Sequence, residues 1–244
     1  MEFNWLLDKP IAHRGFWGEG CAENSLTSYQ RAIDKGYNIE IDVHLMADDN
    51  FAVFHDGNLK RVCGVKRSTR SLTTPELKNY HLSGTEDTIP SLQEVLDLVD
   101  GQVGLLIEMK DFTNRNDACL KLYNILKNYK GKYAIQSFNL AAHGTALRWW
   151  RKHSVDVPIG ILSTRPLEVL LPGWRKHIAP DFYAFDIKGL PVSYIERQRK
   201  VAGAKLLTWT VRSQEAYDKA RRVGVDNIIF DTYRLPEDKA PDAE

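Results

Sequence analysis

The sequence predicts a single α/β domain built as a closed (β/α)8 barrel, and three observations lead to this prediction. The chain has 244 residues, which is close to the usual size of such a barrel. Short apolar runs recur along it, and stretches of helical periodicity separate them, as in parallel strands joined by crossover helices. Eight of these runs are expected as strands, at 11–13, 38–43, 103–109, 133–136, 158–162, 182–185, 205–210 and 227–230.

Helical stretches follow most of the expected strands. Asn24 or Ser25 is expected to cap the first helix, and Gly36 and Gly224 follow two helices where a left-handed residue commonly ends an α-helix. An open, doubly wound sheet is the alternative fold, although no Gly-x-Gly-x-x-Gly motif for a dinucleotide opens any helix. The expected helices span 25–35, 91–98, 118–129, 141–152, 191–201 and 213–223.

One segment departs from the alternation of strand and helix. Two apolar stretches lie on either side of residues 47–50, a connection that is too short for a crossover helix and suits a β-hairpin. With Asp48 and Asp49 in the turn, position 42 is expected to pair with position 55, which places His55 beside Asp42. The expected architecture is therefore a barrel with a β-hairpin extension after the second strand.

The composition is that of an ordinary globular protein. Hydrophobic residues make up 43% of the chain, and 33 basic residues nearly balance 32 acidic ones, so a dominant nucleic-acid-binding face is not expected. The three cysteines form no CxxC pair, which argues against a disulfide framework or a structural zinc site. We expect one domain over 1–244, with its core at about 10–232 and a frayed acidic tail at 237–244.

Targeting and membrane-spanning signals are not found in the sequence. The N-terminus lacks the basic and apolar regions of a signal peptide. No run approaches the roughly 18–20 apolar residues that a transmembrane helix needs. A cytoplasmic protein is therefore expected, and the sequence leaves its oligomeric state open.

Three carboxylates at the ends of two expected strands indicate a metal site. Glu40 and Asp42 lie two residues apart, so their side chains share one face of the strand, and burying two like charges is costly without a cation. Glu108 ends another strand, two residues before Lys110. Oxygen ligands favour a hard divalent cation, Mg²⁺ or Ca²⁺, over zinc. The alternatives are a polar surface pair at 40 and 42 and a simple salt bridge between Glu108 and Lys110.

Two histidines also lie at strand ends on the expected reactive side of the barrel. His13 precedes Arg14, and His55 precedes Asp56. Phosphodiester cleavage needs a base for the attacking oxygen and an acid for the leaving alkoxide, and histidine titrates in the right range for both. Arg14 offers a planar donor fork for phosphate. A single histidine is more often structural than catalytic. The other histidines lack comparable neighbours and are expected to be surface or helix residues; they are His44, His81, His143, His153 and His177.

Several ordered motifs resemble one known family. They are IAHRGF, CAENSLTSYQRAIDKGYNIEIDVHLMADDNFAVFHDGNLKRV, IPSLQEVLDLV, GLLIEMK, LLTWTV and GVDNIIFD, and they run from about residue 10 to about residue 232. Together they resemble the glycerophosphodiester phosphodiesterases. The resemblance implies a TIM barrel, in agreement with the strand count.

The resemblance also implies a role for the residues that match the family motifs. Packing within the barrel is the alternative role for Trp209, and a helix cap is the alternative for Asn24, which with Glu23 matches a Glu-Asn pair of the family. The implied roles are acid and base for His13 and His55, metal binding for Glu40, Asp42 and Glu108, phosphate binding for Arg14 and Lys110, and substrate contact for Trp209.

Three departures from the family pattern bear on the substrate. Cys21-Ala22 stands where a proline is usual, and Arg212 stands where an asparagine is usual after Trp-Thr-Val. The region between the hairpin and Pro90 is too short for the inserted substrate-capping domain of some members. The capping domain is therefore expected to be absent, which leaves a more open mouth.

The expected function is metal-dependent hydrolysis of a small glycerophosphodiester to sn-glycerol 3-phosphate and an alcohol. One divalent cation, Mg²⁺ or Ca²⁺, is the implied cofactor. Cleavage of lysophospholipids at the same site, as by a lysophospholipase D, is the first alternative, with Phe16, Trp17 and residues 167–174 available for an acyl chain. Loop packing is the other explanation for those apolar residues. A non-catalytic ligand-binding barrel is the second alternative.

Overall fold

The computed structural model describes residues 3–110, 115–138, 150, 153, 157–164 and 180–236. Eight parallel strands form a barrel within these ranges, and a ninth strand, β3, extends antiparallel from β2. The barrel closes because β1 pairs with both β2 and β9, which excludes the open-sheet alternative. The strands are β1 (Ile11–His13), β2 (Asn38–Leu45), β3 (Phe51–Val53), β4 (Leu105–Met109), β5 (Tyr133–Ser137), β6 (Ile159–Ser163), β7 (Phe182–Asp186), β8 (Lys205–Val211) and β9 (Asn227–Phe230).

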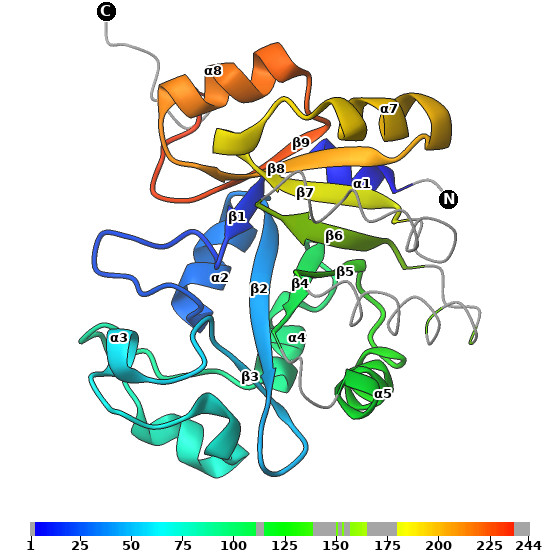
Figure 1. The fold of residues 1–244 in the computed structure, drawn as a ribbon. Helices are drawn as coiled ribbons and strands as arrows, with labels where there is room; N and C mark the ends of the chain where they lie inside the picture. The colour runs from blue at the N-terminus through cyan, green and yellow to red at the C-terminus, as the bar shows by residue number, and fades with distance from the viewer. Residues whose placement is uncertain are drawn as a thin grey trace, which may run out of the picture.

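Helices lie around the outside of the barrel (Figure 1). All eight strands expected in the barrel are present, and the hairpin extension is confirmed as β3. The expected helix at 141–152, apart from Trp150, and the expected tail at 237–244 fall outside the described residues. Among the described helices, none is long and apolar enough to cross a membrane. The main helices are α1 (Asn4–Asp8), α2 (Leu26–Asp34), α4 (Leu92–Val99), α5 (Arg115–Leu126), α7 (Ser193–Ala202) and α8 (Gln214–Val223).

The structure shows which residue caps α2, the first helix after β1. Ser25 Oγ accepts a hydrogen bond from Ser28 N at 3.0 Å, and Ser28 Oγ accepts one from Ser25 N at 3.2 Å, which forms a capping box. Ser25 is therefore the cap, and the Asn24 side chain is available for another role. Gly224 ends α8 with φ 70°, as expected for a left-handed cap.

The hairpin register differs from the expected one by one residue. Val43 pairs with Val53, and Phe54 N donates to Asp42 O at 2.9 Å, so Asp42 faces Phe54 and not His55. The turn contains one more residue than expected, because residues 47–49 all lie in it and Asp49 takes a left-handed φ of 68°. His55 therefore follows the last paired residue.

Two apolar clusters position the residues of interest. The first fills the barrel interior with buried side chains from several strands, among them Ile11, Leu106, Ala134, Ala184 and Leu207. The second lies in the segment between β3 and α4, which we call the β3–α4 lobe (residues 54–90), and which contains α3 (Lys60–Cys63), η1 (Thr69–Ser71) and η2 (Thr74–Asn79). Figure 1 shows this lobe, in cyan, beside the barrel. Its buried core includes Phe54, Leu59, Val62, Leu72 and Leu77.

The loop after β1 depends on Gly15. Replacing Gly15 by alanine is expected to lower the free energy of unfolding by more than about 2 kcal/mol, because the left-handed φ of 84° alone costs a Cβ-bearing residue about 1–2 kcal/mol. The added Cβ would also lie 2.2 Å from Ser28 Oγ and 2.9 Å from the Ser28 backbone carbon. Urea denaturation measures the loss.

Gly36 provides the matched control for that substitution. Its φ is 69°, and no atom of the described residues lies within 4 Å of a Cβ added there. Gly36→Ala therefore carries the backbone strain without the overlap and is expected to cost only about 1–2 kcal/mol. Equal losses for the two variants would contradict the close approach at Ser28.

Candidate active site

Polar side chains line the carboxyl end of the barrel. Side chains alternate across a strand, so residues two apart share a face. Leu106 fills the interior and is followed on the same face of β4 by Glu108. Ala134 is followed in the same way by Gln136 on β5, and Leu207 by Trp209 on β8. Because the apolar side chains pack in the barrel interior, the side chains that follow them on the same strand face line one cavity of about 230 Å³.

Three buried carboxylates lie together beside this cavity, and two of them, Glu40 and Glu108, line it. One oxygen from each of Glu40, Asp42 and Glu108 lies within 4.8 Å of the other two. Lys110 lies against two of them, with Nζ 3.0 Å from Asp42 Oδ1 and 2.6 Å from Glu108 Oε1. Three carboxylate oxygens at this spacing suit a hard divalent cation. The residues named from the sequence as metal ligands are thus brought together.

The protonation of the three carboxylates supports the same interpretation. Burial and the neighbouring Asp42 raise the pKa of Glu40 well above its ordinary value. Burial also raises the pKa of Glu108, to about 7, although Lys110 opposes it. Burial would raise the pKa of Asp42 too, but the positive charges of Lys110 and Arg14 hold that pKa well below its usual range. A bound divalent cation favours the ionised form of all three, so this donor set fits such an ion.

Glu108 makes the stability of the cation-stripped protein depend on pH. Its folded pKa of about 7 exceeds the ordinary value of 4.5, so between these values the folded state binds more protons than the unfolded state. Stability is therefore expected to fall as pH rises from about 4.5 to 7, by about 3 kcal/mol in total. Urea unfolding in EDTA at several pH values measures this. Glu108→Gln should flatten the profile, and a wild-type profile that rises over this window would contradict the shift.

His13 is held by an aspartate from the last strand's end. His13 Nδ1 lies 3.0 Å from Asp231 Oδ2, and the Asp231 side chain is 1% exposed. Burial would raise the pKa of Asp231, but hydrogen bonds from His13 and Arg212 lower it, so the carboxylate is ionised and can only accept. His13 Nδ1 is therefore the donor, which leaves Nε2 for proton transfer. Burial lowers the pKa of His13, although Asp231 opposes this.

Arg212, which departs from the family pattern, holds the same aspartate. Its Nε donates to Asp231 Oδ1 at 2.8 Å and its Nη2 donates to Asp231 Oδ2 at 3.0 Å. The Arg212 side chain is 60% exposed and also lines the cavity. This arginine therefore binds the partner of His13 and borders the cavity.

His55 has an aspartate partner of its own. His55 Nδ1 donates to Asp56 Oδ1 at 2.7 Å, which again leaves Nε2 for proton transfer. Burial lowers the pKa of His55, while the carboxylates of Asp42 and Asp56 oppose this. Asp56 in turn accepts two hydrogen bonds from Arg61 of α3. The two histidines line one cavity, each with its Nδ1 held by a carboxylate.

Arg14 is fixed in the site by three carboxylates. Its backbone N–H donates to Glu40 Oε2 at 3.1 Å, and its Nη1 donates to Glu23 Oε1 at 2.9 Å. Its Nε lies 3.5 Å from Asp42 Oδ2. The backbone φ of 60° is uncommon for arginine and is characteristic of residues whose placement serves a site.

Sequence reasoning did not identify several residues around these groups. Asn24 Nδ2 donates to Asp42 Oδ2 at 3.0 Å, and its Oδ1 accepts from Tyr29 Oη at 2.8 Å, so it orients a carboxylate of the proposed metal site. Gln136 is 1% exposed and lines the cavity, and its Oε1 makes no hydrogen bond within the described part of the chain. The family Glu-Asn pair was the only sequence signal for Asn24.

Trp209 packs within the barrel and also lines the cavity, while its contact with substrate stays a prediction. Its indole Nε1 donates to Ala184 O at 3.0 Å, and its ring packs edge-on against Phe138 with centroids 5.5 Å apart. The same side chain lines the cavity together with Leu162. Trp209 therefore packs in the barrel and also forms an apolar wall of the site.

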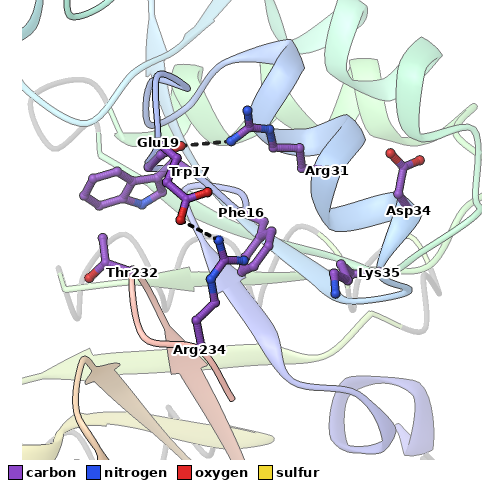
Figure 2. Close-up of a pocket in the computed structure, with 9 residues that line it drawn as sticks. Phe16, Trp17, Glu19, Arg31, Asp34, Lys35, Thr232 and Arg234 are labelled. Atoms are coloured by element: carbon purple, nitrogen blue, oxygen red, sulfur yellow. Dashed lines mark hydrogen bonds and ion pairs between the residues drawn. The ribbon is translucent and has the colours of Figure 1, made fainter. Parts of the chain in front are cut away.

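A second cavity lies outside the site, although it is larger. Figure 2 shows this cavity of about 480 Å³, where Arg31 donates to Gly18 O at 2.9 Å and Arg234 donates to Glu19 at 2.9 Å. Phe16 lines it, with Arg234 over its ring. Trp17 is another wall. Among the described residues that line this second cavity there is no histidine and no cluster of carboxylates, so the smaller cavity is the candidate active site.

The acyl-chain residues named from the sequence are therefore placed elsewhere. Phe16 and Trp17 line the second cavity and not the cavity of the two histidines. Residues 167–174 lie outside the described residues. Phe16 also packs against Tyr37 and Phe230 at centroid distances of 5.8 and 6.2 Å, as loop packing predicts.

Of the remaining five histidines, two follow the expectation, one contradicts it and two are not described. His81 and His153 are exposed, and His143 and His177 are outside the described residues. His44 is wrongly predicted as a surface or helix residue, because it lies in β2 and is 7% exposed. Its Nε2 lies 3.2 Å from His55 O, where the nitrogen can donate to the carbonyl and hold the backbone that carries His55.

Comparison with known proteins agrees with this geometry. A model of the glycerophosphoryl diester phosphodiesterase family matches residues 13–235. The glycerophosphodiester phosphodiesterase of Caldanaerobacter subterraneus subsp. tengcongensis is 28% identical over 236 residues, which cover 91% of this chain and 93% of that protein. Lysophospholipase D GDPD1 of Rattus norvegicus is 29% identical over 178 residues, but the match spans only 55% of its length.

The fold has solved counterparts. The structure of an Oleispira antarctica phosphodiesterase in complex with the product sn-glycerol-3-phosphate aligns with a TM-score of 0.80. The identity is 24%, and the alignment covers 93% of each chain, so this likeness shows the fold. It agrees with the closed barrel described above.

The family match extends over most of the chain and includes every residue that lines the cavity. The alternative of a non-catalytic ligand-binding barrel is not supported. The chain is a phosphodiesterase, a hydrolase, and it belongs to the glycerophosphoryl diester phosphodiesterase family.

Proposed function

We propose that this phosphodiesterase hydrolyses glycerophosphodiesters to sn-glycerol 3-phosphate and an alcohol, with a divalent cation and two histidines. The observation that carries the proposal is that two histidines and two cationic side chains line one cavity, beside a cluster of three buried carboxylates. The names of the bacterial relative and of the Oleispira product complex support the substrate class.

Phosphate binding is assigned to the cationic side chains of the cavity. Arg14 presents a planar guanidinium and Lys110 an ammonium group, and both line the cavity. Glu40, Asp42 and Glu108 would hold Mg²⁺ or Ca²⁺, which supplies positive charge to polarise the phosphoryl oxygens. The substrate phosphate would bind between these groups, in the cavity that both histidines line.

Proton transfer is assigned to the two histidines. One accepts the proton of the attacking hydroxyl at Nε2, and the other donates a proton from Nε2 to the departing alkoxide. The attacking oxygen comes either from water or from the glycerol 2-hydroxyl, in which case water opens the resulting cyclic phosphate. Asp231 and Asp56 hold the Nδ1 protons in both routes, so each ring presents the same nitrogen throughout.

The test compares two substrates that differ by one acyl chain. The purified protein is incubated with glycerophosphocholine or with lysophosphatidylcholine in the presence of Mg²⁺ or Ca²⁺. Release of sn-glycerol 3-phosphate from the first is the expected result, with slower turnover of the second, because Phe16 and Trp17 line a different cavity. Preferential release of lysophosphatidic acid would favour the lysophospholipase D alternative. Turnover of neither would overturn the proposal.

A further inference from the structure

The Arg61 side chain donates hydrogen bonds to two carboxylates at once, those of Asp56 and Glu23. Its Nε and Nη2 donate to Asp56 at 2.7 and 2.9 Å. Its Nη1 and Nη2 donate to Glu23 at 2.9 and 2.6 Å. Arg61 itself does not line the cavity. Four hydrogen bonds from one guanidinium therefore join the end of the hairpin to the loop that precedes α2.

Each of the two carboxylates also accepts a hydrogen bond from a residue of the site. Asp56 Oδ1 accepts from His55 Nδ1 at 2.7 Å, and Glu23 Oε1 accepts from Arg14 Nη1 at 2.9 Å. A continuous chain of charge-assisted hydrogen bonds thus runs from His55 through Arg61 to Arg14. These two ends are the proton-transfer group and the phosphate-binding group proposed above.

Basic and acidic side chains alternate along this series of hydrogen bonds. Burial would raise the pKa of Asp56, but hydrogen bonds from Arg61 and His55 lower it to about 2. Burial likewise opposes ionisation of Glu23, whose pKa the hydrogen bonds and charges of Arg61 and Arg14 lower. Both carboxylates are therefore ionised near neutral pH, as acceptors of several N–H groups must be.

The backbone on either side of Arg61 is anchored. Leu59 and Val62 are 0% and 6% exposed and belong to the apolar core of the β3–α4 lobe. The guanidinium is planar, so its fork fixes the direction of both carboxylates, whereas a lysine in its place offers only a point charge. The Arg61 side chain is 49% exposed, and ion pairs at that exposure contribute little to stability. Positioning, not stability, is the effect that this geometry favours.

We propose that Arg61 is a positioning residue that fixes His55 and Arg14 relative to each other through Asp56 and Glu23. The inference rests on the roles proposed for His55 and Arg14. It assigns to α3, a helix of the β3–α4 lobe that carries no proposed metal ligand, a part in aligning His55 with the bound phosphate.

The first test replaces Arg61 and measures kcat and KM on glycerophosphocholine. Arg61→Ala is expected to lower kcat by about 10–100-fold, the usual effect of removing an outer hydrogen-bond partner, and to raise KM as well. Arg61→Lys should recover only part of this loss. Low, non-denaturing concentrations of guanidinium ion should partly restore kcat in Arg61→Ala.

Arg67→Ala is the matched control. Arg67 belongs to the same lobe and donates to Glu76 at 2.7 Å, away from the cavity. This variant should keep kcat and KM within twofold of the wild type and show no response to guanidinium. A similar loss in both variants would mean that any ion pair of the lobe matters equally, which overturns the proposal.

Conservative variants that retain Arg61 test the connection to His55 and the connection to Arg14 separately. Asp56→Asn should lower kcat with little change in KM, because it loosens His55. Glu23→Gln should raise KM with little change in kcat, because it loosens Arg14. If Asp56→Asn and Glu23→Gln changed the same parameter, kcat or KM, by the same factor, the proposal would be overturned. This test remains available if Arg61→Ala fails to fold.

Failure of this inference is distinct from failure of the proposed function. An active wild type, an inactive His55→Ala and an unchanged Arg61→Ala would overturn the positioning role alone. A wild type that does not hydrolyse glycerophosphocholine would remove the proposed function, and the positioning role with it.

Discussion

Replacing His13 or His55 by alanine is expected to lower kcat on a glycerophosphodiester by about 10²–10⁴-fold, the usual contribution of a general acid or base. Both imidazoles line the cavity, and a carboxylate holds the Nδ1 proton of each. The alanine variants lose the Nε2 nitrogen while the carboxylates and cations around the phosphate remain. KM is therefore expected to change much less than kcat.

His81→Ala is the control for these variants. His81 is exposed in the β3–α4 lobe, and its Nδ1 lies 3.1 Å from Thr85 O, away from the cavity. Its kcat should equal that of the wild type. Thermal unfolding of all three variants checks that the fold persists. Retention of full activity by His13→Ala or His55→Ala would remove that residue from the mechanism.

Replacing Asp42 by asparagine is expected to lower activity by about 10²–10³-fold, which corresponds to the several kcal/mol that a bound cation contributes to the transition state. Asp42 is 0% exposed and is approached by Lys110 at 3.0 Å and by Asn24 at 3.0 Å. The amide keeps the shape and one oxygen but removes the charge that would bind the ion.

A binding measurement separates this effect from a general loss of structure. A divalent cation that binds the folded wild type should raise its melting temperature, and this increase should be lost in Asp42→Asn. Asp34→Asn is the control, because Asp34 lies at the end of α2 and accepts a hydrogen bond only from the exposed Gln30 among the contacts described here. An unchanged cation response in Asp42→Asn would exclude Asp42 as a ligand.

The sequence predicts the barrel well because the barrel depends on local patterns. Strand runs and the alternation of strand and helix are visible over short stretches, and β1 and β9 have the expected bounds. Glu40 and Asp42 are predicted to share a strand face because they lie two residues apart, and Glu108 is predicted to join them because it ends another strand. Their convergence then follows from the parallel pairing of β2 with β4.

Contacts between distant segments could not be read in the same way. His13 and Asp231 lie 218 residues apart, and no periodicity relates them. Arg61 and Glu23 lie 38 residues apart, and their contact depends on how the β3–α4 lobe sits against the loop after β1. The predicted hairpin register was wrong because the turn contains one more residue than expected, with Asp49 in a left-handed conformation.

The most direct test of the proposed metal-dependent reaction is an assay of sn-glycerol 3-phosphate release from glycerophosphocholine, first in EDTA and then after addition of excess Mg²⁺ or Ca²⁺. The cluster of Glu40, Asp42 and Glu108 predicts that EDTA abolishes release and that a divalent ion restores it. Asp42→Asn should remain inactive under both conditions. Undiminished release in EDTA would contradict a catalytic cation at these carboxylates.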